Sequence, residues 1–215
     1  MNSSDGLRRL LRESGISSES AYAQKLLGYL GLLEKWNARI NLTAATEWAS
    51  LEPLFREGIW ASQIYPPEAV SYLDIGSGAG FPALILRILI PHIRLELVES
   101  RAKKGAFLET AIDALGLQGA DVHSERLEIF LSHVEGNKVW DCIGWKGVKL
   151  KTGDLLALRA HAHPGTQFWM FHGKELPVED PAAVEQNFEI IRVEKLPVRE
   201  ESSLSVYKSS APSRQ

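Results

Sequence analysis

The N-terminal part of the chain carries apolar side chains at helical spacing. Two helices are predicted before residue 41, with apolar stripes formed by Leu7, Leu10 and Leu11 in the first and by Tyr22, Leu26, Leu30, Leu33 and Trp36 in the second. A third helix is predicted from Leu51 to Ile64, because Pro66 and Pro67 follow it and cannot continue a helix. Residues 1–68 are therefore predicted to form a helical extension.

From Val70 onward, short apolar runs alternate with helical segments. Strands are predicted at Ser71–Ile75, Ile93–Val98, around Val122, Val139–Ile143 and Phe168–Phe171, and helices from Pro82, at Lys103–Leu115, around Arg126–His133 and around Thr152–His161. This alternation implies βαβ crossovers and a parallel sheet with helices on both faces. The runs Phe188–Leu196 and Ser203–Tyr207, separated by Pro197 and a charged turn, predict an antiparallel hairpin. We therefore predict an α/β fold with a doubly wound, mostly parallel sheet over residues 69–210, followed by a tail, 211–215.

Composition excludes several classes of protein. The chain has 215 residues, of which 45% are hydrophobic and 24% charged, as is typical of a globular protein. The longest apolar run, Ala83 to Ile90, is far shorter than the roughly 20 residues of a membrane-spanning helix, and the N-terminus has no apolar signal-peptide core. Cys142 is the only cysteine, so an internal disulfide is impossible and a reducing cytoplasm is expected.

The charge balance is close to neutral. There are 24 Lys and Arg residues against 27 Asp and Glu residues, and a net charge of −3 argues against a protein that coats nucleic acid by charge alone. Lys146, Lys149 and Lys151 form a local basic stretch without an acidic residue. Such a stretch is compatible with RNA binding, but lysines of this kind are more often just a solvated face.

A glycine-rich run follows the first predicted strand, Asp74-Ile75-Gly76-Ser77-Gly78-Ala79-Gly80-Phe81-Pro82. Its three glycines let the backbone turn sharply and approach a ligand, at the carboxyl end of a strand where open α/β sheets bind ligands. A dinucleotide fingerprint requires glycine where Phe81 stands, which disfavours a dehydrogenase. Glu99 ends the second strand, where a carboxylate can accept both ribose hydroxyls of a cofactor. The pattern resembles motif I of class I S-adenosylmethionine-dependent methyltransferases.

A second motif narrows the resemblance. The segment Leu33-Glu34-Lys35-Trp36-Asn37-Ala38-Arg39-Ile40-Asn41-Leu42-Thr43 is similar to the L-x-x-W-N-x-x-x-N-L-T signature of the bacterial small-subunit rRNA methyltransferase G family, also called glucose-inhibited division protein B. The stretch Glu99-Ser100-Arg101-x-Lys103-Lys104-x-x-Phe107-Leu108 resembles the same family, and the similarity extends over roughly residues 20 to 210. The resemblance implies methyl transfer from S-adenosylmethionine to N7 of one guanine in 16S rRNA.

The resemblance also implies a cofactor site by position. The residues it assigns are Gly76 and Phe81 at the methionine and sulfonium part, Asp74 at water or the amino group, Glu99 at the ribose, Leu127 and Glu128 at the adenine, Gly78 and Gly80 in the loop, and Lys146 beside the cofactor. Lys146 is also the candidate catalytic residue, because it occupies the place of a family arginine and is expected to face the substrate. The 16S rRNA or the small ribosomal subunit is the expected partner. We expect a monomer, with no metal and no membrane association.

Departures from the family pattern lie on the substrate side. The chain has Arg56-Glu57-Gly58-Ile59-Trp60-Ala61-Ser62 where the family has Arg-His-x-x-Asp-Ser, and Trp145-Lys146-Gly147 where it has Ser-Arg-Ala. His172 and Ser202 replace a lysine and an arginine, and a lysine at position 146 lacks the planar fork of arginine. Guanine N7 has an available lone pair, so its methylation needs alignment rather than a general base. Two alternatives stay open: a cofactor-binding protein that has lost methyl transfer, and a methyltransferase for another RNA or a small molecule.

Two further sets of residues have competing interpretations. Trp60 and Trp145 stand near the expected target pocket, where they either stack on a flipped guanine or simply pack. His161 and His163 are spaced like a metal pair, but no third ligand lies at typical spacing, so we expect solvated histidines at a helix end.

Overall fold

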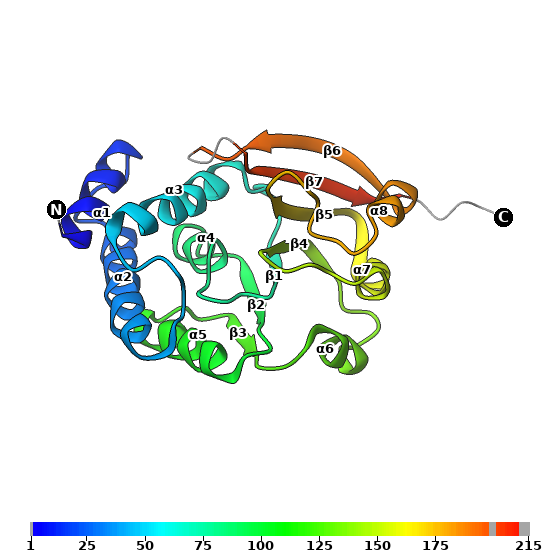
Figure 1. The fold of residues 1–215 in the computed structure, drawn as a ribbon, viewed down its shortest axis with the longest axis horizontal. Helices are drawn as coiled ribbons and strands as arrows, with labels where there is room; N and C mark the ends of the chain where they lie inside the picture. Colours follow the sequence, from blue (N-terminus) through cyan, green and yellow to red (C-terminus); the bar gives the residue numbers. More distant parts are fainter. Residues whose placement is uncertain (1, 198–200, 211–215) are drawn as a thin grey trace.

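A single seven-stranded sheet organises the molecule (Figure 1). The computed structural model describes residues 2–197 and 201–210, and within them the strand order is β3-β2-β1-β4-β5-β7-β6. The strands are β1 (Ser71–Ile75), β2 (Arg94–Val98), β3 (Ala120–His123), β4 (Trp140–Lys146), β5 (Ala162–His172), β6 (Phe188–Lys195) and β7 (Ser203–Ser209). The first five pair in parallel, whereas β7 pairs antiparallel with both β5 and β6. The predicted mostly parallel sheet with an antiparallel C-terminal hairpin is confirmed.

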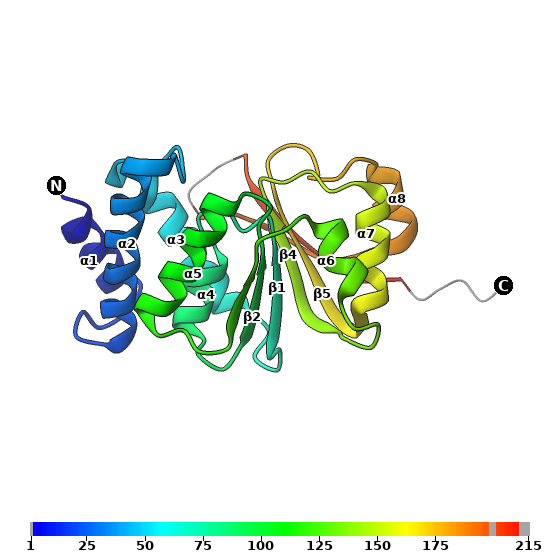
Figure 2. The same cartoon turned by 90° about the horizontal axis from the view of Figure 1, so that it is seen from below.

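Helices cover both faces of the sheet (Figure 2). They are α1 (Ser3–Glu13), α2 (Ala21–Ile40), α3 (Trp48–Ile64), α4 (Ala83–Leu89), α5 (Ala102–Leu115), α6 (Leu127–His133), α7 (Thr152–Leu158) and α8 (Pro181–Asn187). Helices α4 and α5 lie on one face and α6 and α7 on the other, while α1 and α2 form a further layer outside α4 and α5 (Figure 2). This arrangement is the doubly wound architecture that strand–helix alternation predicts.

The structure differs from the sequence predictions in small ways. Helix α8 was not predicted, although Asp180 caps its first turn by accepting from the Ala182 N–H and Pro181 suits its first position. Tyr22, in the first turn of α2, is 41% exposed, and the buried stripe instead includes Tyr29. Helix α8 has only seven residues, and it lies outside the strand–helix alternation that indicated the equally short α6 and α7.

The N-terminal helices share one apolar core with the sheet-bearing part. Buried residues of α1, α2 and α3 belong to the same cluster as those of α4, α5 and one face of the sheet. Gly58 of α3 lies so close to α4 that a Cβ atom there would be 2.7 Å from Cδ1 of Ile85. Close packing of these two helices therefore determines where α3 lies relative to the sheet. Among the described residues, no helix is both long and apolar enough to cross a membrane.

Candidate active site

The glycine-rich loop after β1 is held by its own backbone and by its neighbours. The Gly76 N–H donates to the Val98 carbonyl at 2.8 Å, and the Gly80 N–H donates to the Ser77 carbonyl at 2.7 Å. Gly76 has a φ of +69°, and a Cβ atom there would lie 2.1 Å from a methyl carbon of Val148. A side chain at position 76 would therefore be both strained and blocked, which explains the glycine.

The N-terminal helices fasten this loop. The Tyr29 hydroxyl, on α2, donates to the Ala79 carbonyl at 2.6 Å. The Phe81 ring packs against Tyr29 and against Phe55 of α3, with ring centroids 5.4 Å apart in both pairs. The helical extension therefore sets the position of Phe81 at the end of the loop.

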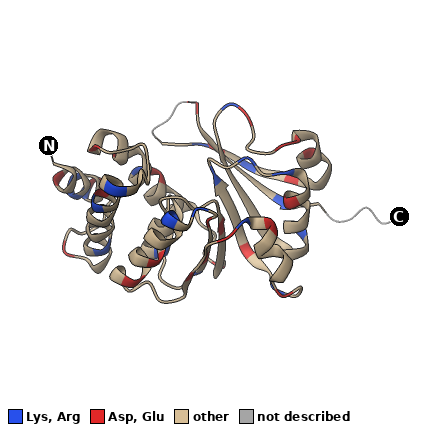
Figure 3. Ribbon diagram, turned by 60° about the horizontal axis from the view of Figure 1, so that its bottom comes forward, with Lys and Arg blue, Asp and Glu red and all other residues tan. Residues whose placement is uncertain are grey.

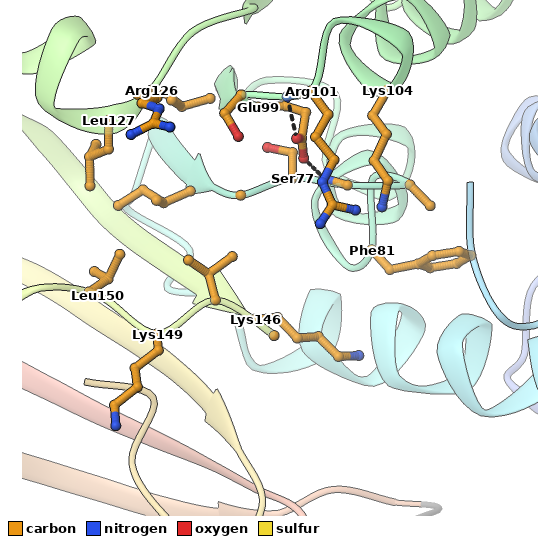
Figure 4. A pocket seen from close by; sticks show the side chains of 18 of the residues that line it. Ser77, Phe81, Glu99, Arg101, Lys104, Arg126, Leu127, Lys146, Lys149 and Leu150 are labelled. Carbon is orange, nitrogen blue, oxygen red and sulfur yellow. Dashed lines mark hydrogen bonds between the residues drawn. The ribbon is translucent and has the colours of Figure 1, made fainter. Parts of the chain in front are cut away.

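Glu99 joins the loop to the end of β2. Its carboxylate is 5% exposed, and it accepts a 2.8 Å hydrogen bond from the Gly78 N–H on one oxygen and another of 2.8 Å from the Arg101 N–H on the second (Figure 4). A carboxylate has about four acceptor sites, so each oxygen retains capacity for one more donor. The geometry therefore allows Glu99 to accept from two adjacent hydroxyls while it holds the loop.

A cavity of about 820 Å³ opens beside these residues, within the usual size range of small-molecule and cofactor sites. Arg101 and Lys104 reach into it from the start of α5, opposite Phe81, and Arg126 and Leu127 lie at its other end (Figure 4). Of the residues predicted for the site, Gly76, Gly78, Phe81, Glu99, Leu127, Glu128 and Lys146 line this cavity. Segments from β1, β2, α6 and β4 therefore meet at the carboxyl edge of the sheet.

Asp74 and Gly80, also predicted for the site, lie beneath the loop and not among the residues that line the cavity. Asp74 is 2% exposed, and one of its oxygens accepts from the Tyr72 hydroxyl at 3.3 Å while the other has no hydrogen-bond partner. Burial raises the pKa of Asp74 to about 7. A Cβ atom at Gly80 would lie 2.6 Å from Cδ1 of Leu84. Both residues therefore support the loop and do not face the cavity. The sharp turn of the loop places Gly76 and Gly78 at the cavity.

The opposite side of the cavity is built around Lys146, at the end of β4. Its ammonium lies 2.5 Å from one carboxylate oxygen of Glu57 on α3. The Lys146 side chain is 20% exposed and that of Glu57 only 1%. The second oxygen of Glu57 is buried, with no hydrogen-bond partner. This pair replaces the arginine and histidine expected at these positions with a lysine and a carboxylate of opposite charge.

Basic and acidic residues alternate around the cavity. Lys and Arg residues lie on both halves of the molecule, interspersed with Asp and Glu (Figure 3). Arg101, Lys104 and Arg126 line the cavity but were not among the predicted site residues. Arg101 and Lys104 lie within the motif that follows Glu99, so the signal was present in the sequence. Lys151 pairs with Glu128 across one end of the cavity at 3.1 Å.

The tryptophans do not face an open site. Trp145 is fully buried, and its ring N–H donates to the Pro177 carbonyl at 3.1 Å, so stacking of Trp145 on a base is excluded. Trp145 is buried because it lies on β4, in the middle of the sheet, with its side chain in an apolar cluster. Trp60 packs partly buried against the main apolar cluster.

The two histidines serve the structure at the other edge of the sheet. His161 is 7% exposed, with one ring nitrogen 2.9 Å from the Lys138 carbonyl, and His163 lies 2.9 Å from a carboxylate oxygen of Asp141. The expectation of solvated histidines is therefore wrong for His161, because the ring packs against Trp140. Within the described part of the chain, no three His, Cys, Asp or Glu side chains gather as metal ligands.

Comparisons with known proteins agree with this architecture. A family model described as rRNA small subunit methyltransferase G matches residues 22–180. A ribosomal RNA small subunit methyltransferase G from Halalkalibacterium halodurans is 30% identical over 146 residues, 63% of this chain and 58% of the relative. The protein of that name from Bacillus velezensis is 30% identical over 213 residues, 86% of this chain and 88% of the relative. The chain thus spans less than two thirds of the first relative's length.

Among solved structures, the mitomycin 7-O-methyltransferase MmcR is similar in fold. The superposition has a TM-score of 0.62 and 13% sequence identity, and it covers 97% of this chain and 68% of that protein. At this level of identity the likeness concerns the fold alone. It places the sheet and its helices in the class I methyltransferase architecture.

Proposed function

This chain belongs to the rRNA small subunit methyltransferase G family, and from that premise we propose that it transfers a methyl group from S-adenosylmethionine to N7 of one guanine in 16S rRNA. The observation that carries the proposal is the cavity at the carboxyl edge of the sheet, where Glu99 and the glycine loop form a nucleoside-sized cradle. We propose further that the protein acts as a monomer in the cytoplasm, without a metal ion.

The residues on the β1–β2 side fit this cofactor. Glu99 has acceptor capacity left on both oxygens for the two ribose hydroxyls, and Leu127 and Glu128 line the end of the cavity suited to adenine. Gly76 and Phe81 would lie at the methionine end, with the buried Asp74 outside the lining of the cavity. When bound, S-adenosylmethionine supplies an electrophilic methyl group on a sulfonium ion.

The protein's own contribution is to orient the acceptor and exclude water. N7 of guanine carries a lone pair that needs no deprotonation, so alignment supplies most of the rate enhancement. Lys146, at the boundary of the cavity, is the residue that we propose contacts the RNA, and Lys149 on the same segment is exposed. Contacts of such lysines to phosphates position an RNA without reading its sequence.

Methyl transfer from labelled S-adenosylmethionine to unmodified small subunits, and to deproteinised 16S rRNA, tests the proposal. The label should appear as 7-methylguanosine at a single position, mapped by nuclease digestion and mass spectrometry. Calorimetry with S-adenosylmethionine on the same preparation provides the control for cofactor binding. Cofactor binding without any labelled 7-methylguanosine would refute the proposed activity and leave a changed substrate or a binding-only protein.

A further inference from the structure

A second cavity, of about 380 Å³, lies beside the segment that follows β4. Residues 146–149 line both cavities, so the two share a wall. The far side of the second cavity is formed by the end of β5, at Phe171 and His172, and by Pro177. Its volume suits a single flat ring system better than an intact nucleotide cofactor.

Glu57 is the unusual residue of this second cavity. It lines the cavity with a side chain that is 1% exposed, its first oxygen pairs with Lys146, and its second oxygen has no partner. A buried carboxylate with an unused oxygen is costly, because that oxygen has lost water without gaining a protein donor. The position therefore favours a ligand that brings N–H donors, and such a ligand reaches the carboxylate by displacing the more exposed Lys146.

We propose that the second cavity receives the acceptor base, and that Glu57 recognises it as guanine by accepting from N1–H and N2–H after Lys146 moves aside. This inference rests on the proposed function. Guanine is the only standard RNA base with two neighbouring N–H donors on its Watson–Crick edge, which matches the two oxygens of one carboxylate. Enzymes that act on single bases commonly read them by this edge.

The same orientation serves the reaction. N7 lies on the imidazole ring, away from N1 and N2, so a guanine held by Glu57 keeps N7 free to face the first cavity past residues 146–149. Attack by the N7 lone pair forms the nitrogen–carbon bond as the carbon–sulfur bond breaks, and the positive charge passes from sulfur to the purine. A carboxylate beside that purine stabilises the developing charge. The displaced Lys146 ammonium becomes available to an RNA phosphate.

Replacement of the target guanosine by inosine tests this inference, because inosine keeps N7 and N1–H but lacks the N2 amino group. A 16S rRNA with one inosine at the mapped position is made by ligation and methylated alongside the guanosine form. We expect wild-type protein to prefer guanosine by roughly tenfold or more in kcat/KM, as for loss of one hydrogen bond to a buried charge. In Glu57→Gln the preference should shrink, because the amide keeps one acceptor oxygen but loses the negative charge and the second acceptor.

Two controls separate Glu57 from its partner. Lys146→Ala retains the carboxylate, so it should be slower on both RNAs and keep the preference for guanosine. Unchanged S-adenosylmethionine affinity in Glu57→Gln shows that this variant is folded. Equal preference in wild type and Glu57→Gln, or a preference that disappears in Lys146→Ala, would overturn the inference. Both results require measurable methylation of the guanosine RNA, so they differ from a failure of the proposed function, in which neither RNA is methylated.

Discussion

The two sides of the first cavity are held together by different forces. On the β1–β2 side, the carboxylate of Glu99 is tied to backbone N–H groups of Gly78 and Arg101. On the β4 side, Lys146 is tied to Glu57 by a side-chain ion pair in which one oxygen is left without a partner. Backbone bonds fix one geometry, whereas a side-chain pair can exchange partners.

Under the proposed function, this difference corresponds to what each side binds. A cofactor common to a whole class of enzymes can be held by a loop whose shape depends on glycines and backbone bonds. An acceptor differs between enzymes, and it is recognised by side chains that substitution can alter. Of the departures from the family pattern, those at positions 57, 146, 172 and 202 line the second cavity, whereas Trp60 and Trp145 pack against apolar side chains.

The largest effect is expected from breaking the β1–β2 side at Gly78. Gly78 has a φ of +57° and faces the cavity, so Gly78→Val should strain the backbone and fill the cofactor site. Calorimetry should then detect no S-adenosylmethionine binding. Gly116→Val is the matched control, because its φ is +58° with no atom near a Cβ and it does not line the cavity. Retained binding in Gly78→Val would argue against the cofactor assignment.

Breaking the β4 side should leave cofactor binding intact. Lys146→Ala is expected to reduce kcat/KM for RNA by at least about tenfold while S-adenosylmethionine affinity stays the same, since the pair lies at the boundary of the cavity. Because Glu57 would stay buried without its counter-ion, the free energy of unfolding should fall by about 3 kcal/mol. Lys149→Ala, which removes an exposed lysine from the same segment, should not change stability. Weakened cofactor binding in Lys146→Ala would contradict the division into two sides.

The pH dependence of the free energy of unfolding distinguishes the buried Asp74 from the half-buried Glu96. Burial raises the pKa of Asp74 to about 7 from 3.8, so the folded state binds more protons than the unfolded state between these values. The free energy of unfolding should therefore fall as pH rises, by on the order of 2 kcal/mol between pH 5 and pH 7, and Asp74→Asn should abolish this decline. Denaturant titrations of both proteins across this range measure the difference.

Glu96, also on the sheet, provides the opposite sign as a control. Although partial burial acts to raise its pKa, the His123 ring nitrogen 3.4 Å away and the polar contacts with Lys138 and Trp140 prevail and lower it to about 2. Its contribution to stability should be present above pH 4.5 and lost as pH falls toward 2, so Glu96→Gln should flatten only the acid side of the profile. An Asp74→Asn profile parallel to wild type between pH 5 and pH 7 would show that Asp74 is ionised throughout.

The smallest effect tests whether RNA contacts extend to the β1–β2 side. Lys104 lines the cavity, whereas its neighbour Lys103 is exposed and does not line the cavity. Lys104→Gln should raise the KM for RNA by roughly threefold and reduce the salt dependence of binding by about one charge, whereas Lys103→Gln should not. Identical salt slopes in the two variants would confine the RNA to the β4 side.

The sequence by itself determined the order of helices and strands, the position of the glycine loop after β1 and the position of Glu99 at the end of β2. Each depends on local signals: apolar periodicity, the turn chemistry of Gly76 and Gly78, and a terminal acid on the second strand. The same signals could not show that Asp74 lies under the loop or that Trp145 is buried, because both depend on which face of the sheet a side chain occupies.

Only the tertiary structure decided how the β4 side of the cavity is built. Glu57 and Lys146 are 89 positions apart, and they meet because Gly58 lets α3 pack closely on α4. In the sequence, Glu57 and Lys146 are two unrelated departures, one from a family histidine and one from a family arginine. In the folded protein the two substituted residues form a single ion pair, and the second oxygen of Glu57 is buried beside it. The sequence could not show this pair, because contacts between distant segments arise from packing and not from local pattern.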